Sequence, residues 1–321
     1  MKKVFIDGGA GTTGLRIVER LSARDDLTLI TLPDALRKDI SARKEALNEA
    51  DIAFLCLPDA AAIEAVSLIE NDTTVVIDTS TAHRTAQGWT YGFPELVGRE
   101  AVAKAKRIAN PGCHASGFVA LVAPLVRAGL LSPDAALTAF SLTGYSGGGK
   151  GMIADYENED RDPLLNAPRQ YALKQSHKHL PEMAKLSGLT VAPLFSPIVA
   201  DYYSGMEVTV PLFTKELACK GKDAISVIEG IYRATYTGKV VRFENADENG
   251  FLSASSLSGS DAMTVSVYGN EERILLVSRF DNLGKGASGA AIQNMNLSLG
   301  CDETAGLVLS RKGNLSDVYK N

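Results

Sequence analysis

The sequence predicts an α/β protein in which an N-terminal, doubly wound parallel sheet of the Rossmann type precedes an α+β domain with a mostly antiparallel sheet. Strand-like and helix-like segments alternate from the start of the chain to Ile108, and a glycine-rich turn joins the first strand to the first helix. Beyond that point, β-branched segments separated by turns replace the alternation. A length of 321 residues is sufficient for two domains.

Composition excludes several classes of protein. The chain is 45% hydrophobic and 22% charged, as in globular proteins with a sizeable core, and its net charge of −5 argues against a general nucleic-acid binder. The N-terminus has too few apolar residues for a signal peptide, and Pro124 and Arg127 interrupt the longest apolar run, so we expect no membrane partner. The cysteines lack disulfide-type or metal-type spacing, which favours a cytoplasmic protein with reduced thiols and no metal. They are Cys56, Cys113, Cys219 and Cys301.

The first strand, Lys3–Asp7, is followed at once by a turn with glycines at positions 8, 11 and 14, and then by a helix with Leu15, Val18 and Leu21 on one face. Such glycines let the backbone approach a pyrophosphate that is held at the helix N-terminus. We therefore predict a dinucleotide site here. The alternative is a tight turn in an α/β protein that binds no nucleotide.

The end of the second strand, Leu27–Leu32, bears on the choice between NAD and NADP. An NAD site usually has an acidic residue there, and Asp34 lies two residues beyond the strand. Arg37 and Lys38 could instead receive a 2′-phosphate, which favours NADP. Two solvated loop charges are the alternative.

Two further strands are expected over Asp51–Leu57 and Thr74–Ile77, with a helix over Ala60–Ile69 between them. Asp78, Ser80 and Arg84 follow the second of these strands. Ligands bind at the carboxyl ends of strands in doubly wound sheets, so these side chains are candidates for the site.

The segment Asn110-Pro111-Gly112-Cys113 delivers a cysteine to the start of an apolar helix expected over Phe118–Val126. A helix N-terminus lowers a thiol pKa by about one unit, so a reactive thiolate near neutrality needs a further partner, for which we expect an imidazolium. A buried, inert cysteine is the alternative.

The second half contains two polar clusters. Gly144–Gly151 resembles the first part of a P-loop, but Gly151 stands where a hydroxyl is required and no apolar helix is expected, so we predict a loop that contacts substrate through Ser146 or Lys150. The segment from His177 to Glu182 holds two histidines suited to proton transfer. A surface loop and a metal site with Glu182 are the alternatives.

Strands are expected over Ala136–Thr143, Thr190–Pro193, Met206–Phe213, Val240–Phe243, Met263–Gly269 and Arg273–Ser278, and helices over Lys222–Thr235 and Ala290–Leu299.

Taken in order, these segments resemble the N-acetyl-γ-glutamyl-phosphate reductases of arginine biosynthesis in their shorter form. The resemblance covers nearly the whole chain and is carried by the glycine turn, Phe54–Asp59, Asn110–Cys113, His177-x-His179-x-Pro181-Glu182 and Asp281–Leu297. The wider family includes aspartate-semialdehyde and glyceraldehyde-3-phosphate dehydrogenases, which share a Rossmann domain followed by an α+β catalytic domain.

The resemblance implies a reaction and a set of site residues. Cys113 would attack an acyl phosphate and form a thioester, which NADPH would reduce, with His179 as general acid/base and His177 and Glu182 near the substrate. Ser146 and Arg84 are also expected at the substrate, although longer forms of the enzyme tend to carry an arginine in the 144–151 loop. The residues expected to bind NADP are Gly8, Gly11, Thr12, Thr13, Gly14, Arg37, Lys38, Pro58, Ser80 and Asn282.

The same resemblance sets the expected domains: residues 1–112 for NADP binding, completed by a C-terminal helix over 286–321, and residues 113–285 for catalysis and assembly into a dimer or tetramer. Three alternatives remain open. They are a related reductase of aspartyl phosphate or of a carrier-bound amino-adipyl phosphate, a non-catalytic nucleotide-sensing protein, and a cysteine hydrolase, which leaves the glycine turn unexplained.

Overall fold

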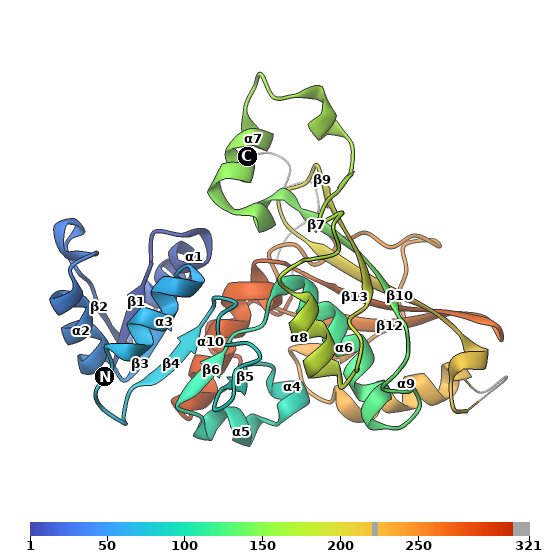
Figure 1. The fold of residues 1–321 in the computed structure, drawn as a ribbon, viewed down its shortest axis with the longest axis horizontal. Helices are drawn as coiled ribbons and strands as arrows, with labels where there is room; N and C mark the ends of the chain where they lie inside the picture. Colours follow the sequence, from blue (N-terminus) through green and yellow to red (C-terminus); the bar gives the residue numbers. More distant parts are fainter. Residues whose placement is uncertain (220–223, 311–321) are drawn as a thin grey trace.

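The computed structural model describes residues 1–219 and 224–310, and it contains two sheets joined by helices (Figure 1). The first sheet is parallel throughout, with strand order β2-β1-β3-β4-β6-β5. Its strands are β1 (Lys2–Asp7), β2 (Leu27–Ile30), β3 (Ile52–Leu55), β4 (Val75–Asp78), β5 (Thr90–Tyr91) and β6 (Arg107–Ala109). The strand order reverses at β1, so the carboxyl ends of β1 and β3 flank the crevice where such sheets bind ligands.

Helices cover both faces of this sheet, as the doubly wound prediction requires. One face packs on α1 (Thr12–Ser22), α5 (Arg99–Lys104) and α10 (Gly289–Ser298), and the other on α2 (Ile40–Glu49) and α3 (Asp59–Ser67). Neighbouring residues Val4 and Phe5 of β1 enter the two different cores, because side chains alternate along a strand. Helix α10, the last helix described, lies between the two halves of the molecule in Figure 1.

The second sheet is mostly antiparallel, as predicted, with strand order β11-β12-β13-β10-β7-β9-β8. Its parallel pairs are β11 with β12 and β7 with β9. Its strands are β7 (Thr138–Gly144), β8 (Arg169–Gln170), β9 (Leu194–Ala200), β10 (Met206–Phe213), β11 (Val241–Phe243), β12 (Met263–Gly269) and β13 (Arg273–Phe280).

One face of the second sheet is covered by α6 (Cys113–Arg127), α8 (Leu180–Ser187) and α9 (Ala224–Thr235), with the short α4 (Pro94–Val97) beside α6. Helix α6 is buried along almost its whole length, and the hydroxyl of Tyr232 on α9 donates to the carbonyl of Leu121 at 2.7 Å. The N-terminus of α6 is therefore held rigidly by the core of the molecule.

Three expectations about secondary structure are wrong. Thr190–Pro193 is not a strand, because the chain joins β7 only from Leu194 onward. The segment Gly144–Gly151 is not a loop: a 3₁₀ turn (Tyr145–Gly148) leads into α7 (Gly149–Glu157). No helix runs on from residue 286 through the described chain, because α10 ends at Ser298 after a π-helical turn, η5 (Gly284–Ser288). Residues 220–223, with the expected helix start at Lys222, and 311–321 lie outside the described residues.

Among the described residues, no helix combines the length and the apolar character needed to cross a membrane.

Candidate active site

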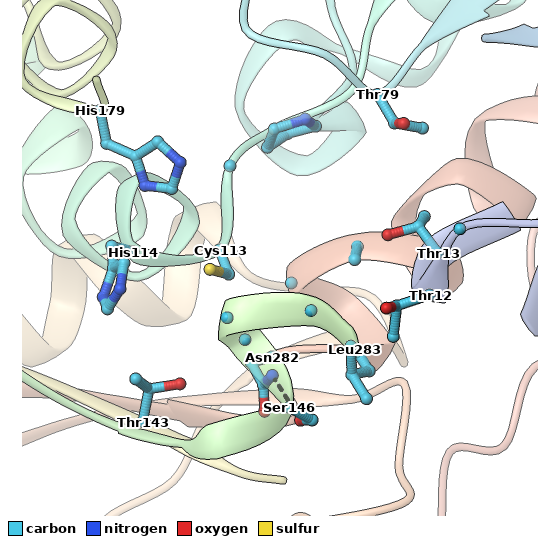
Figure 2. Close-up of a pocket in the computed structure, with 18 of the residues that line it drawn as sticks. Thr12, Thr13, Thr79, Cys113, His114, Thr143, Ser146, His179, Asn282 and Leu283 are labelled. Atoms are coloured by element: carbon cyan, nitrogen blue, oxygen red, sulfur yellow. Dashed lines mark hydrogen bonds between the residues drawn. The ribbon is translucent and has the colours of Figure 1, made fainter. Parts of the chain in front are cut away.

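The cysteine turn lies on the wall of a cavity of about 470 Å³ between the two halves of the molecule (Figure 2). Helix α6 begins at Cys113 itself, after Gly112 in an extended conformation, and no side chain caps the first turn. In Figure 2, His114 and His179 lie on the same side of the cavity as Cys113, and Thr12 and Thr13 lie on the opposite side. The predicted position of the thiol at a helix N-terminus is confirmed.

Glu182 holds the turn in front of this cysteine. Its carboxylate is 2% exposed and accepts hydrogen bonds from the Gly112 N–H at 2.8 Å, the Tyr91 hydroxyl at 2.8 Å and Arg84 Nη1 at 3.1 Å. The other guanidinium donors of Arg84 go to the carbonyls of Asn110 and Thr79. Glu182 is thus occupied by protein donors, and its contacts favour a positioning role over the expected direct contact with substrate.

Three histidines meet at the cavity. The rings of His177 and His179 lie 4.7 Å apart, and the ring of His114 lies 5.6 Å and 5.7 Å from them. Burial lowers the pKa of His114 to about 3 and that of His177 to about 4, and burial, aided by the Arg84 charge, holds the pKa of His179 well below its usual range. All three rings are therefore neutral near pH 7. Nδ1 of His179 is buried and finds no hydrogen-bond partner among the described residues, which leaves this nitrogen available for proton exchange.

Burial also raises the pKa of the Cys113 thiol, and the largest opposing contribution comes from Arg84, followed by a backbone hydrogen bond from His114. Desolvation thus disfavours the expected thiolate–imidazolium pair in the resting site, because it raises the pKa of the thiol and lowers that of His179. The cation that favours the thiolate is the Arg84 guanidinium, which Glu182 holds in place.

His114 and Tyr171 are functional candidates that the sequence reasoning missed. His114 is 3% exposed, lines the cavity, and joins Ser141 Oγ through Nδ1 and the Tyr171 hydroxyl through Nε2, both at 2.7 Å. The one signal was the position of His114 beside the cysteine. Nothing local relates Tyr171 to it.

The glycine turn fits the pyrophosphate of a dinucleotide. Gly8 has φ +84°, and a Cβ there would lie 2.3 Å from the Cys56 carbonyl at the end of β3, while a Cβ on Gly14 would lie 2.6 Å from the Gly8 carbonyl. Helix α1 starts after Gly11 with no side-chain cap and no acidic residue in its first turn. Its free N–H groups and positive dipole end thus line the cavity that contains Cys113.

A second cavity of about 610 Å³ continues from this turn along β1 and β2. Arg37 and Lys38 line it together with Gly8, as expected for the adenosine end of a dinucleotide. Arg37 also pairs with Asp34 at 2.7 Å, although both side chains are largely exposed.

Asn282 and Ser146 meet in the first cavity. Asn282 donates from Nδ2 to Ser146 Oγ at 3.0 Å and accepts the Gly205 N–H at 2.9 Å, and both side chains are buried (Figure 2). The π-helical turn η5 follows, and a Cβ on its Gly286 would lie 3.0 Å from the Cβ of Cys113. The segment after β13 therefore forms the wall beside the cysteine.

Two family models cover most of the chain. The model described as "Semialdehyde dehydrogenase, NAD binding domain" matches residues 33–105, and "Semialdehyde dehydrogenase, dimerisation domain" matches residues 113–282. A protein of Chelativorans sp. (strain BNC1) named N-acetyl-gamma-glutamyl-phosphate reductase is 47% identical over 306 residues, which cover 92% of this chain and 98% of that protein. N-acetyl-gamma-glutamyl-phosphate reductase 2 of Nostoc sp. (strain PCC 7120) is 43% identical over 318 residues, which cover 95% of this chain and 99% of that protein. The chain belongs to the N-acetyl-γ-glutamyl-phosphate reductase family.

Solved structures share its fold at low sequence identity. Aspartate semialdehyde dehydrogenase II of Vibrio cholerae, complexed with ASA, superposes with a TM-score of 0.69 at 17% identity and covers 94% of this chain and 98% of that one. Aspartate semialdehyde dehydrogenase with NADP from Candida albicans superposes with a TM-score of 0.63 at 16% sequence identity. This match covers 94% of this chain and 99% of that one. The predicted fold class is confirmed, and membership of this oxidoreductase family with its NAD-binding domain makes a nicotinamide dinucleotide the cofactor class.

The structure gathers most of the residues expected from the family pattern. Around the first cavity lie Gly11, Thr12, Thr13, Gly14, Arg84, Cys113, Ser146, His177, His179 and Asn282. Two expected cofactor contacts lie elsewhere: Ser80 turns its hydroxyl to Asp78 Oδ2 at 2.7 Å, and Pro58 is exposed at the start of α3. Their neighbours Thr79 and Leu57 line the cavity instead, as does Lys178.

Proposed function

We propose that this protein reduces N-acetylglutamyl 5-phosphate to N-acetylglutamate 5-semialdehyde and phosphate with NADPH, as a step of arginine biosynthesis. The observation that carries the proposal is the single cavity in which Cys113, His179 and the Gly11–Gly14 turn lie together. A nucleophile, a proton carrier and a dinucleotide site in one space are what a thioester-forming reductase requires. The names of the relatives supply the substrate.

The first step uses groups of this chain alone. The neutral His179 accepts the proton of the Cys113 thiol, which is possible because burial keeps the imidazole unprotonated. The thiolate attacks the acyl carbon of the substrate, the bond between that carbon and the phosphate oxygen breaks, and a thioester and inorganic phosphate result. Arg84 favours the thiolate electrostatically, and the N–H groups at the start of α6 are suited to the developing oxyanion.

The second step discharges the thioester. NADPH, when bound, supplies hydride to the thioester carbonyl. The resulting thiohemiacetal on Cys113 collapses to the aldehyde, and the protonated His179 returns its proton to the departing sulfur. The lack of a side chain on Gly286 leaves room for the acyl group beside Cys113, because an added Cβ there would lie 3.0 Å from the Cβ of the cysteine.

The preference for NADP over NAD is part of the proposal. Its support is the pair Arg37 and Lys38 on the wall of the second cavity, in the segment that follows β2, because Rossmann domains accommodate the 2′-phosphate with basic residues near this strand. The cytoplasm is the proposed location, supported by four cysteines that are all free.

We further propose that the protein forms a homo-oligomer through the open face of the second sheet. Phe140, Leu194, Phe213 and Leu275 are 43–56% exposed, and the strand registers place all four on one face. Apolar exposure of this size on a sheet indicates an interface. The variant Phe213→Glu should lower the mass measured by light scattering, and an unchanged mass would count against this face.

The substrate is tested in the reverse direction. The protein is incubated with NADP, inorganic phosphate and one semialdehyde at a time, and NADPH is followed by absorbance. We expect phosphate-dependent turnover with N-acetylglutamate semialdehyde and none in Cys113→Ala. Preference for aspartate semialdehyde or for a carrier-bound semialdehyde would identify a related reductase, and cofactor binding without turnover would indicate a sensing protein.

A further inference from the structure

Helix α7 belongs to the second half of the chain but lies against the dinucleotide cavities of the first half. Gly149 lines the cavity that contains Cys113, whereas the next residue, Lys150, lines the second cavity. Of the residues that the structure describes, Lys150 is the one beyond position 61 that lines this second cavity. Leu57 lines both cavities, so the two spaces adjoin there. The first turn of α7 therefore lies against both cavities.

The backbone geometry fixes this approach. Gly149 has φ +75°, which side-chain-bearing residues rarely adopt, and a Cβ on it would lie 3.9 Å from the hydroxyl of Thr12 on α1. The N-terminal turns of α7 and α1 are thus near neighbours. Lys150 follows directly in the same helix and lines the second cavity.

The charges in the second cavity are unbalanced. Asp7 is the one acidic residue among the described residues that line it, and its carboxylate lies 3.0–3.1 Å from the Arg43 guanidinium, so the two charges neutralise each other. Within the described part of the chain, Lys38 and Lys150 have no ion-pair or hydrogen-bond partner, and Arg37 has only its exposed pair with Asp34. Three cations from two halves of the chain hence face one space with no buried counter-ion.

We propose that Lys150 binds the 2′-phosphate of NADP together with Arg37 and Lys38, and so closes the second half of the chain over the cofactor. The inference rests on the proposed NADP preference. The pyrophosphate is the other candidate anion, but the N–H groups suited to it at Gly11–Gly14 line the first cavity, whereas Lys150 lines the second cavity together with Arg37 and Lys38. The expected contact of Lys150 with substrate gives way to this role, because Cys113 and Lys150 line different cavities.

The test is a binding measurement on the whole protein. Dissociation constants for NADPH, NADH, 2′,5′-ADP and 5′-ADP are measured by calorimetry for the wild type, for Lys150→Met and for the control variant Lys104→Met. The exposed Lys104 side chain pairs with Glu100 within α5. We expect Lys150→Met to weaken NADPH and 2′,5′-ADP about tenfold, the value of one charge-assisted hydrogen bond, and to leave NADH and 5′-ADP within about twofold. The control should bind all four ligands as the wild type does.

Each other outcome is informative. Equal weakening of NADPH and NADH would place Lys150 at the pyrophosphate and overturn the inference, as would no change at all. If the wild type itself binds NADH as tightly as NADPH, the proposed NADP preference fails, whatever Lys150 does. Hydrogen exchange gives an independent readout: 2′,5′-ADP should protect the amides of α7 in the wild type but not in Lys150→Met, and equal protection in both would contradict the closure.

Discussion

Replacing Gly112 by alanine tests the packing of the nucleophile turn. A Cβ at this position would lie 2.3 Å from Arg84 Nη1 and 2.5 Å from His179 Nε2, whereas ordinary contacts begin at 3.4 Å. Both side chains must therefore move by about 1 Å, a displacement that can lower a rate by about 10²-fold. The backbone of Gly112 has φ −77° and ψ 145°, which alanine adopts readily, so the variant acts through its methyl group alone.

The assay compares kcat/KM with the acyl phosphate and the dissociation constant of NADPH. We expect kcat/KM of Gly112→Ala to fall about 100-fold and NADPH affinity to stay unchanged, because the Gly11–Gly14 turn is a separate wall of the cavity. Gly230→Ala is the matched control: nothing lies within 4 Å of an added Cβ in α9, so this variant should be fully active and more stable by about 0.5–1 kcal/mol. Retention of more than half of kcat/KM in Gly112→Ala would refute the assigned positions of Arg84 and His179.

Three further changes test the chemistry and the core. His179→Asn should lower kcat/KM by about 10²–10⁴-fold, and a larger loss in His177→Asn would transfer the proton-carrier role to that residue. The rate of alkylation of Cys113 by iodoacetamide should rise with pH. Its midpoint should lie above the pKa of ~8.5 of a free thiol, because burial raises the pKa of this cysteine. A rate that is already at its plateau at about pH 6 would instead indicate an ion pair. Lys285→Met should lower the free energy of unfolding, measured in urea, by about 3–5 kcal/mol, because it leaves the buried Glu95 carboxylate without its cationic partner at 2.8 Å. The double variant with Glu95→Leu should recover part of this loss. An unchanged midpoint of urea unfolding in Lys285→Met would contradict this.

The sequence predicted well those strands whose residue pattern, alternation or β-branching between turns, lies entirely within the strand. Met206–Phe213 and Met263–Gly269 are strands over the predicted residues, because each alternates or is β-branched between clear turns. The strand expected at Thr190–Pro193 failed for a different reason. The true strand β9 contains Pro197, a residue that argues against a strand in the sequence. In the fold, the Pro197 carbonyl accepts the Tyr171 N–H, and pairing with β7 and β8 holds the segment extended.

The candidate site divides in the same way. Cys113 and the glycine turn could be predicted because each carries its chemistry in a local motif at a helix N-terminus. The contact of Tyr171 with His114 joins positions 57 residues apart through packing, so no motif contains it. The protonation states could not be predicted either, because burial and the Arg84 charge determine them and both arise only in the folded chain.

In the proposed reaction, Cys113 carries the acyl group while hydride arrives. The most direct test of this step is the mass of the intact protein after brief incubation with N-acetylglutamyl phosphate in the absence of NADPH, followed by acid quenching and peptide mapping. We expect a gain of one N-acetylglutamyl group on the peptide that contains Cys113, its disappearance on addition of NADPH, and no gain in Cys113→Ala. An unmodified Cys113 in a protein that still turns over, or the acyl group on another residue, would contradict this step.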